Sequence, residues 1–412
     1  MISPLFGAAR MPRNLVFGAG QRGSLPGYVG ALGKRALIVT DARLADEPVF
    51  AEMQHGIEAA GCAVSVYSGT VAELPAENIA EALAHGQKSG ADVIVGIGGG
   101  SCMDAAKVVA LLLAHGGKAS DYYGEFKVPG PVVPLVAVPT TSGTGSEVTP
   151  VAVVSDPDRA VKVGIASPHL IAHTAICDPE LTYSCPPALT AVSGADALTH
   201  AIEAFTTLRR DVTPTMVHEH VFIGKNAMSD HYALEAIRLI GSSLKQAYDN
   251  GQDHAARERL MLGATLAGLA FGTAGTAAAH AVQYPVGALT HTPHGAGVAV
   301  MMPYVMAFNR SHAEAEIAQV AQALGLPVEG LDQAKQAQAA IDAVTDLFAA
   351  IGIPPTLRAL GMSEDKLDWT ANAALGATRL VKNNPRPLDA ASMSLLVRAA
   401  YSGEMARLGA DT

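Results

Sequence analysis

The sequence predicts a protein of two parts, an N-terminal α/β domain built on a parallel sheet and an all-helical C-terminal domain. Short β-rich runs alternate with amphipathic stretches in the first half of the 412 residues, whereas strand signals nearly vanish after about residue 186. Hydrophobic residues make up 49% of the chain and charged residues 16%, so a chain of this length can bury large cores. We place the two domains at residues 1–185 and 186–412.

Continuous apolar runs predict the strands of the first half, at residues 36–40, 63–67, 92–97 and 135–138. The stretches between them, such as 50–60 and 77–88, have the periodicity of amphipathic helices. Apolar strands that alternate with helices are typical of a parallel sheet covered on both faces.

Ala- and Leu-rich segments with helical spacing fill the second half. They span residues 188–207, 229–249, 254–272, 313–323, 334–351 and 390–407. An irregular stretch at 209–226 interrupts them. This half is therefore predicted to be mostly helical.

Charge and cysteine content exclude several classes of protein. The net charge is −10, and no basic stripe is present to contact a nucleic-acid backbone. Four scattered cysteines do not make a disulfide framework, which fits a reducing compartment. The N-terminal residues lack the pattern of a signal peptide, and the longest apolar runs are too short for a bilayer. We expect a cytoplasmic protein that binds neither nucleic acid nor membrane.

A glycine-rich segment follows the third predicted strand and opens a helix. Residues 96–107 read G-I-G-G-G-S-C-M-D-A-A-K. Gly98, Gly99 and Gly100 let the backbone approach a bulky anion, which the N–H groups and the dipole of the helix start then attract. The alternative is an ordinary tight turn, but three glycines followed by Ser101 favour a pyrophosphate site.

Two further polar positions follow predicted strands. Asp41 can accept hydrogen bonds from ribose hydroxyls and repel a 2′-phosphate, or it can cap a helix. Residues 139–148, P-T-T-S-G-T-G-S-E-V, place several hydroxyls beside glycines at another strand end. The hydroxyls can donate to phosphate or ribose oxygens, and Asp41 in its ribose-binding role favours NAD over NADP.

Acidic and imidazole side chains lie in apolar surroundings in the second half. Asp196 and His200 are four residues apart, so on a helix they share one face. His280 lies in an Ala-rich helix that is expected to stop before Pro285, and His294 starts another apolar segment. One carboxylate and three imidazoles can hold a divalent metal with a position open for substrate. The alternative for each side chain is an ordinary buried hydrogen bond, but the four together favour a metal.

Other side chains are given lesser roles. His218 and His220, in the irregular stretch 209–226, are interpreted as a surface or lid element. His291 is interpreted as neutral polar lining. Cys102, although it lies at a helix start, is interpreted as a packed side chain.

Together these motifs resemble the iron-containing (group III) alcohol dehydrogenase family along the whole chain. The shared patterns lie at residues 98–107, 139–148, 162–165 (K-V-G-I), 178–182 (D-P-E-L-T), 194–204 (G-A-D-A-L-T-H-A-I-E-A) and 292–295 (T-P-H-G). The resemblance implies a dehydroquinate synthase-like architecture, in which the active site lies between a dinucleotide-binding α/β domain and a helical domain. It implies metal ligation by Asp196, His200, His280 and His294. It also implies that the NAD-binding residues are Asp41, Gly98, Gly99, Gly100, Ser101, Asp104, Thr140, Thr141, Thr144 and Lys162.

The sequence departs from the family pattern at several points. Tyr284 stands where relatives carry a second His, four residues after the third ligand, so a proton relay there would use a phenol or ordered water. F-G-T-A at 271–274 replaces F-x-N-A, which predicts a roomier pocket. E-L-P at 73–75 replaces Pro-Asn-Pro near the adenosine side, and the stretch 209–226 is longer than in compact members.

The activity that the resemblance implies is reversible hydride transfer between a primary alcohol, or hydroxy acid, and NAD. Catalytic roles fall to Asp196, His200, His280, His294 and Tyr284. The ligand types suit Fe²⁺ and Zn²⁺ alike, and only the resemblance favours iron. A homodimer is the default expectation.

Alternatives remain on the same scaffold. One is a hydroxyacid–oxoacid transhydrogenase, whose cofactor stays bound. Another is a maleylacetate reductase, although those enzymes tend to lose the carboxylate ligand. A lyase of the dehydroquinate synthase kind and a catalytically dead nucleotide sensor are more distant.

Overall fold

The computed structural model describes residues 5–156 and 161–409, and the chain forms two compact units. The helical unit comprises Met1–Ala9, Cys185–Met216 and Phe222–Thr412. The α/β unit comprises Arg10–Ser184 and Val217–Val221. The predicted architecture of a parallel α/β part and a helical part is confirmed, while the domain limits 1–185 and 186–412 stay a prediction.

A six-stranded parallel sheet forms the centre of the α/β unit, with the strand order β1-β9-β6-β4-β2-β3. The strands are β1 (Asn14–Phe17), β2 (Arg35–Val39), β3 (Ala63–Tyr67), β4 (Val93–Gly98), β6 (Leu135–Pro139) and β9 (Thr174–Cys177). Four of them lie where apolar runs predicted strands. The sequence did not reveal β1 and β9, because a four-residue strand offers too few apolar positions to stand out.

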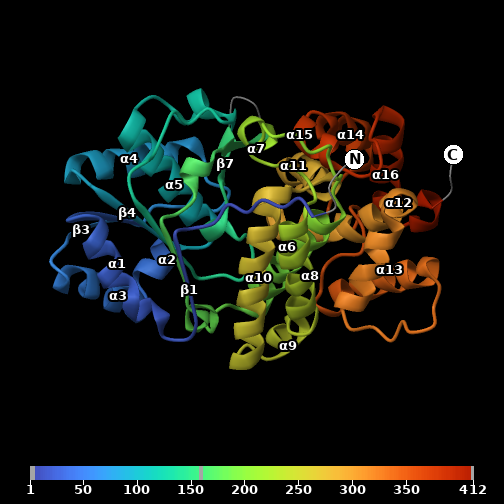
Figure 1. Cartoon of the computed structure of the whole chain (residues 1–412), viewed down its shortest axis with the longest axis horizontal. Coiled ribbons are helices and arrows are strands. Elements are labelled where there is room, and N and C mark those ends of the chain that lie inside the picture. The colour runs from blue at the N-terminus through green and yellow to red at the C-terminus, as the bar shows by residue number, and fades with distance from the viewer. Residues whose placement is uncertain (1–4, 157–160, 410–412) are drawn as a thin grey trace. The chain divides into compact units, whose positions relative to one another are not determined.

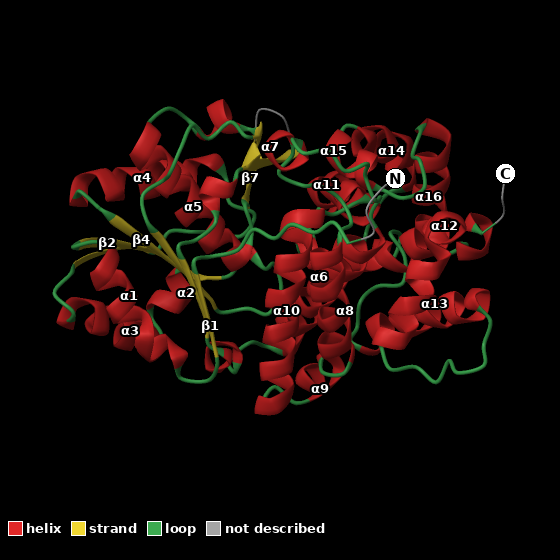
Figure 2. Cartoon of the chain, in the orientation of Figure 1, coloured by secondary structure: helices red, strands yellow, loops and turns green. Residues whose placement is uncertain are grey.

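Alternate side chains of the strands enter two separate cores. The main helices of this unit are α1 (Leu25–Leu32), α2 (Ala42–Ala45), α3 (Pro48–Ala59), α4 (Ala76–Ser89) and α5 (Gly100–His115). Leu37 and Val39 of β2 share a core with α4 and α5, whereas Ala36 and Ile38 share the other with α1 and α3. Figure 2 shows these helices on opposite sides of the strands. Both faces of the sheet are thus covered, as the apolar runs predicted.

A smaller sheet of three strands has the order β5-β8-β7. Its strands are β5 (Gly124–Glu125), β7 (Val151–Asp156) and β8 (Val161–Ala166). β7 and β8 pair antiparallel. The sequence V-A-V-V-S-D of β7 puts apolar residues on both faces, so no alternation signals this sheet.

The helical unit is built from ten α-helices of six residues or more within the part of the chain that the structure describes (Figure 1). They are α6 (Pro187–Thr206), α8 (Ala227–Gly241), α9 (Leu244–Asp249), α10 (His254–Ala274), α11 (Ala278–Thr290), α12 (His294–Ala323), α13 (Gln333–Ala350), α14 (Leu367–Leu375), α15 (Thr378–Asn383) and α16 (Ala390–Ser402). The stretch 209–226 contains one short helix, α7 (Met216–Glu219). Among the described residues no single helix has the length and apolar character to cross a bilayer, although α10 and α11, bent by 103°, meet that test as a pair.

The expectation that the helix of His280 stops before Pro285 is wrong. α11 continues through Pro285 to Thr290. Pro285 and Val286 are both buried. Packing of this turn therefore outweighs the single hydrogen bond that a proline cannot donate.

The segment 229–249 is two helices rather than one. The hydroxyls of Ser242 and Ser243 both donate to the carbonyl of Leu239, at 3.1 and 2.7 Å. Such side-chain bonds compete with the helical backbone pattern and end α8 before α9 begins. Similarly, the segment 390–407 leaves the helix at Ser402, because Gly403 adopts the left-handed conformation that ends many helices.

Candidate metal centre

Helix α6 places three ionisable side chains in one helical register. Asp196, His200 and Glu203 occupy positions i, i+4 and i+7 and so lie along one face. Their exposed fractions are 3%, 5% and 1%. Burying such groups is unfavourable unless each finds a partner or a cation. Their contacts therefore indicate whether this face forms internal hydrogen bonds or a cation site.

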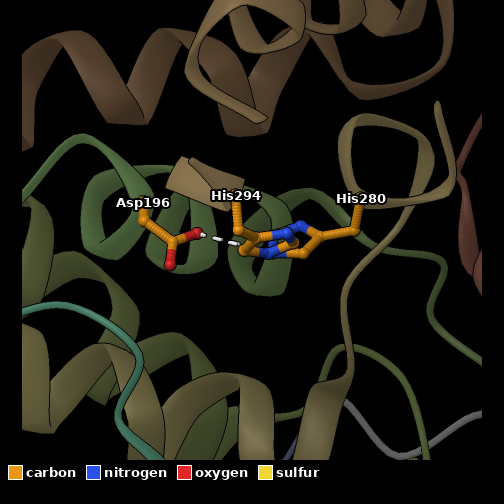
Figure 3. A group of neighbouring side chains, drawn as sticks. All are labelled: Asp196, His280 and His294. Carbon is orange, nitrogen blue, oxygen red and sulfur yellow. Dashed lines mark ion pairs between the residues drawn. The ribbon is translucent and has the colours of Figure 1, made fainter. Parts of the chain in front are cut away.

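Three imidazoles converge on one carboxylate oxygen. The Nε2 atoms of His200, His280 and His294 lie 3.7, 3.7 and 3.9 Å from Oδ1 of Asp196. These spacings are too long for hydrogen bonds, but they are near the ~3.4 Å that separates donors around a tetrahedral ion with bonds of ~2.1 Å. Figure 3 shows Asp196, His280 and His294 pointing toward one another.

The starts of two helices deliver the ligands from outside α6. His280 is the third residue of α11 and His294 is the first of α12. A Cβ atom at Gly295 would lie 2.1 Å from the carbonyl oxygen of Val192 in α6. Glycine at this position therefore lets the start of α12 rest on the backbone of α6, which brings His294 to Asp196.

The ligand atoms of Asp196, His280 and His294 all lie within 4.8 Å of one another. His200 stays outside this tight group, although it reaches the same Asp196 oxygen. Its ring stacks between Phe271 and His280, with centroid distances of 4.2 and 4.6 Å. His200 as fourth ligand stays a prediction.

The donor set fits a divalent cation. Nε2 of His280 is buried and has no hydrogen-bond partner among the residues that the structure describes. A buried nitrogen in that state is costly, and a cation held between it and the Asp196 carboxylate would remove the cost. Imidazole with one carboxylate is a set that suits Fe²⁺ and Zn²⁺.

A second arrangement lies in the α/β unit, where β4 turns directly into α5. Gly98 has a φ of 146° and would clash with Cys102 Sγ at 2.7 Å if it carried a Cβ. A Cβ at Gly100 would lie 2.7 Å from Cγ2 of Thr144. Glycines are thus required for the backbone to turn and for the loop at 140–145 to come close. The result is a helix N-terminus of the kind that binds phosphate.

Comparisons with known proteins identify one family along most of the chain. The model of the iron-containing alcohol dehydrogenase family matches residues 12–179, and that of the C-terminal part of the Fe-containing alcohol dehydrogenase family matches residues 190–401. The chain belongs to the iron-containing alcohol dehydrogenase family. A long-chain-alcohol dehydrogenase of Geobacillus thermodenitrificans is 36% identical over 90% of both chains. An NAD-dependent methanol dehydrogenase of Bacillus methanolicus is 34% identical over 89% of this chain and 92% of its own. The crystal structure of a 1,3-propanediol oxidoreductase superposes with a TM-score of 0.89 at 33% identity, covering 97% of this chain and all of the other.

Membership in this family confirms the predicted class of enzyme, an alcohol and aldehyde oxidoreductase of an NAD-dependent family with an Asp/His metal site. The family name implies an iron site, and the cluster of Asp196, His280 and His294 is a group that could hold such an ion.

Tyr284, which stands where relatives carry a second His, is half-buried on α11. Its ring centroid lies 6.5 Å from that of His294. Its catalytic role stays a prediction. His291, by contrast, is an exposed residue at the end of α11 with a φ of 53°, and His218 and His220 are also exposed.

The residues proposed to hold the cofactor have internal partners as well. Asp41 caps α2, since its Oδ1 accepts from the N–H of Leu44 at 2.9 Å. Asp104 is half-buried, and its two oxygens accept from Ser146 Oγ at 2.6 Å and from the N–H of Val153 at 2.9 Å. Burial raises the pKa of this carboxyl.

The other members of the predicted cofactor set lie at the strand ends or beside them. Thr140 is buried and its N–H donates to the carbonyl of Gly98 at 3.0 Å, while Thr141, like Ser101 and Gly99, is half-buried. Lys162 of β8 forms an ion pair with Glu73. Contacts of any of these residues with NAD stay a prediction.

Glu203 is the residue that reasoning from the sequence missed. Its Oε2 lies 2.6 Å from Nδ1 of His280, and its Oε1 accepts from the N–H of Ala279 at 2.7 Å. Its spacing, seven residues after Asp196 and three after His200, places Glu203 on the same helix face as these two residues and could have pointed to it. An acid at that spacing reads as an ordinary buried polar residue until the position of α11 is known.

Proposed function

We propose that this chain catalyses reversible hydride transfer between a primary alcohol, or a hydroxy acid, and NAD, with Fe²⁺ held by Asp196, His200, His280 and His294. The observation that carries the proposal is the convergence of three Nε2 atoms on the Asp196 oxygen at 3.7–3.9 Å. Iron is favoured by the family, since the donor types alone suit Zn²⁺ as well.

The residues of the centre supply position and charge. A bound divalent ion would act as a Lewis acid that lowers the pKa of an alcohol hydroxyl. Asp196 would supply one negative charge and the three histidines neutral nitrogens, so a divalent ion with these four ligands would keep one positive charge that favours an anionic oxygen. The half-buried phenol of Tyr284, beside His294, offers a group that can pass the proton to water.

The cofactor is proposed to bind at the start of α5. The N-terminus of that helix and the glycines at 98–100 would receive the pyrophosphate, with Thr140, Thr141 and Thr144 alongside. Asp41, at the carboxyl end of β2, would accept from the adenosine ribose and disfavour NADP.

A homodimer is also proposed, as the commonest oligomeric state of soluble enzymes. The mass of the protein in solution, measured by light scattering, should be twice that of one chain, and this test does not depend on activity.

The test of the activity combines metal analysis with a cofactor assay. Protein purified without oxygen should contain about one iron per chain and should reduce NAD with primary alcohols longer than ethanol, seen as NADH absorbance. Turnover of an alcohol with an aldehyde but without net NADH would instead indicate a transhydrogenase.

The variant Asp196→Asn should lose both the metal and the activity. Removing the charged ligand should weaken metal binding by more than the roughly 10- to 100-fold loss that follows from changing a residue behind a ligand. Asp178→Asn is the matched control, because Asp178 is also a fully buried carboxylate but accepts from Gly20 and Arg22 in the α/β unit. Wild-type metal content in Asp196→Asn would contradict the ligand assignment.

A further inference from the structure

Glu203 contacts both the ring of one ligand and the backbone beside it. Its side chain is buried, with an exposed fraction of 1%. Oε2 lies 2.6 Å from Nδ1 of His280, and Oε1 accepts from the N–H of Ala279 at 2.7 Å. Nothing in the activity proposed above assigns this carboxylate a role.

The contact with Ala279 replaces a missing helix cap. The first N–H groups of a helix have no partner within the helix, and the residue before α11, Ala277, has no side chain that can accept from them. Glu203 supplies an acceptor from α6 instead. One carboxylate therefore fixes the start of α11 and the ring that this helix carries.

A carboxylate at position 203 favours one tautomer of His280, because a carboxylate can only accept hydrogen bonds. A backbone N–H can only donate, so Oε1 must be an acceptor. When Nδ1 also carries its proton and donates to Oε2, the lone pair of the ring is on Nε2. This is the atom 3.7 Å from Oδ1 of Asp196. In the opposite tautomer Nε2 would carry the proton, and that proton would block a cation.

We propose that Glu203 is a positioning residue that holds His280 in the Nδ1-protonated tautomer before the metal binds, so that Nε2 is ready to accept a divalent cation. The inference rests on the metal centre of the proposed function. Partners of this kind typically contribute 10- to 100-fold in metal affinity.

The variant Glu203→Gln distinguishes a carboxylate from an isosteric amide. An amide has one accepting oxygen, and the N–H of Ala279 needs it, so the NH₂ group would face Nδ1 of His280. Nδ1 would then have to accept, which moves the ring proton to Nε2. The variant keeps the shape of Glu203 but should reverse the tautomer.

The first measurement needs no metal and no turnover. Metal-free wild-type protein with ¹⁵N-labelled histidine, the His280 signals assigned with a His280→Gln sample, should show a protonated Nδ1 and a bare Nε2 by NMR. Glu203→Gln should show the reverse. A wild-type spectrum with the proton on Nε2 would overturn the inference, and this spectrum suffices even if the variant does not fold.

The second measurement is the affinity for Fe²⁺ or Zn²⁺ in competition with a chromogenic chelator. Glu203→Gln should bind 10- to 100-fold more weakly than wild type, whereas Asp178→Asn, the same change on a buried carboxylate of the α/β unit, should bind as wild type. Equal affinity in a folded Glu203→Gln protein would also overturn the inference. A wild-type protein that binds no metal but has the expected tautomer would refute the proposed function and leave the tautomer assignment standing.

Discussion

Two buried nitrogens show how a structural group differs from a functional one. Lys107 is fully buried, yet its ammonium donates to the Thr149 carbonyl and hydroxyl and to the Val151 carbonyl, at 3.0, 3.3 and 2.8 Å. Burial lowers the pKa of Lys107 to about 8, and its contacts tie α5 to β7. Nε2 of His280 is buried without any such partner in the described parts of the chain. Lys107 is thus part of the framework, and His280 is arranged for a ligand that comes from outside.

Cysteine labelling tests the environment of Cys102. Burial, and then the charge of Asp41, raise the pKa of this thiol from 9.0 to about 12. At pH 8 the thiolate fraction is then about 10⁻⁴ rather than about 10⁻¹. Because a thiolate of higher pKa is also the stronger nucleophile, the reaction with a disulfide reagent should be about 30- to 60-fold slower than that of an ordinary thiol. Between pH 7 and 9 the rate should rise tenfold per unit without levelling off, because both values lie below the pKa.

The other cysteines provide the comparison. Cys62 and Cys177 are buried, whereas Cys185 is only half-buried, so native protein should show one fast thiol out of four. Cys185→Ser should remove the fast phase, and denaturant should expose all the remaining thiols. Rapid labelling of Cys102 in folded protein, identified by mass spectrometry, would contradict the assigned environment.

At the scale of elements, the sequence predicts the features of helices and strands that depend on residues close together in the chain. The face shared by Asp196 and His200 follows from helical spacing alone, and α6 confirms it. The end of α11 was predicted wrongly, because the tertiary packing of Pro285 and Val286 is not visible in a local rule. Glu203 was missed for the same reason, since its partners are 76 and 77 residues away in the chain.

The close approach of α12 to α6 can be tested through Gly295. Gly295→Ala would place a methyl group 2.1 Å from the Val192 carbonyl oxygen, which is backbone and cannot rotate away. The start of α12 would shift, and His294 with it. We expect a loss of about 1–3 kcal/mol in the free energy of unfolding, together with weaker metal binding in the chelator assay.

Gly27→Ala is the matched control for this change. Gly27 lies inside helix α1, and an added Cβ would have nothing within 4 Å. Alanine there should leave metal affinity unchanged and raise stability by about 0.4–1 kcal/mol, because it restricts the unfolded chain. If Gly295→Ala behaved like Gly27→Ala in both measurements, the packing of α12 on α6 would not position His294.

At the scale of the whole molecule, the sequence pattern changes near residue 186 from short β-rich runs to helical spacing of apolar residues. This change predicts the two kinds of architecture, because parallel strands and amphipathic helices have different periodicities. Periodicity does not predict which unit the N-terminal segment and residues 217–221 join. The first belongs to the helical unit and the second to the α/β unit, each against its place in the sequence. Both are held by contacts with distant residues: Ala227 donates to the carbonyl of Phe6 at 2.9 Å, and Arg10 donates to the carbonyl of Val217 at 2.5 Å.

The same division predicts separate responses to the two ligands. The proposed metal ligands all lie in the helical unit and the proposed phosphate-binding residues all lie in the α/β unit. A ligand that binds only the folded state stabilises it by about 2.7 kcal/mol at 100 times its Kd. Metal should therefore slow hydrogen exchange in α6, α11 and the start of α12, measured by mass spectrometry, whereas NAD should slow it in β4, α5 and residues 140–145. With Asp196→Asn the response to metal should disappear while the response to NAD remains. If NAD instead protected α6 and α11 in metal-free protein and left α5 unchanged, the cofactor would not bind at the glycine turn.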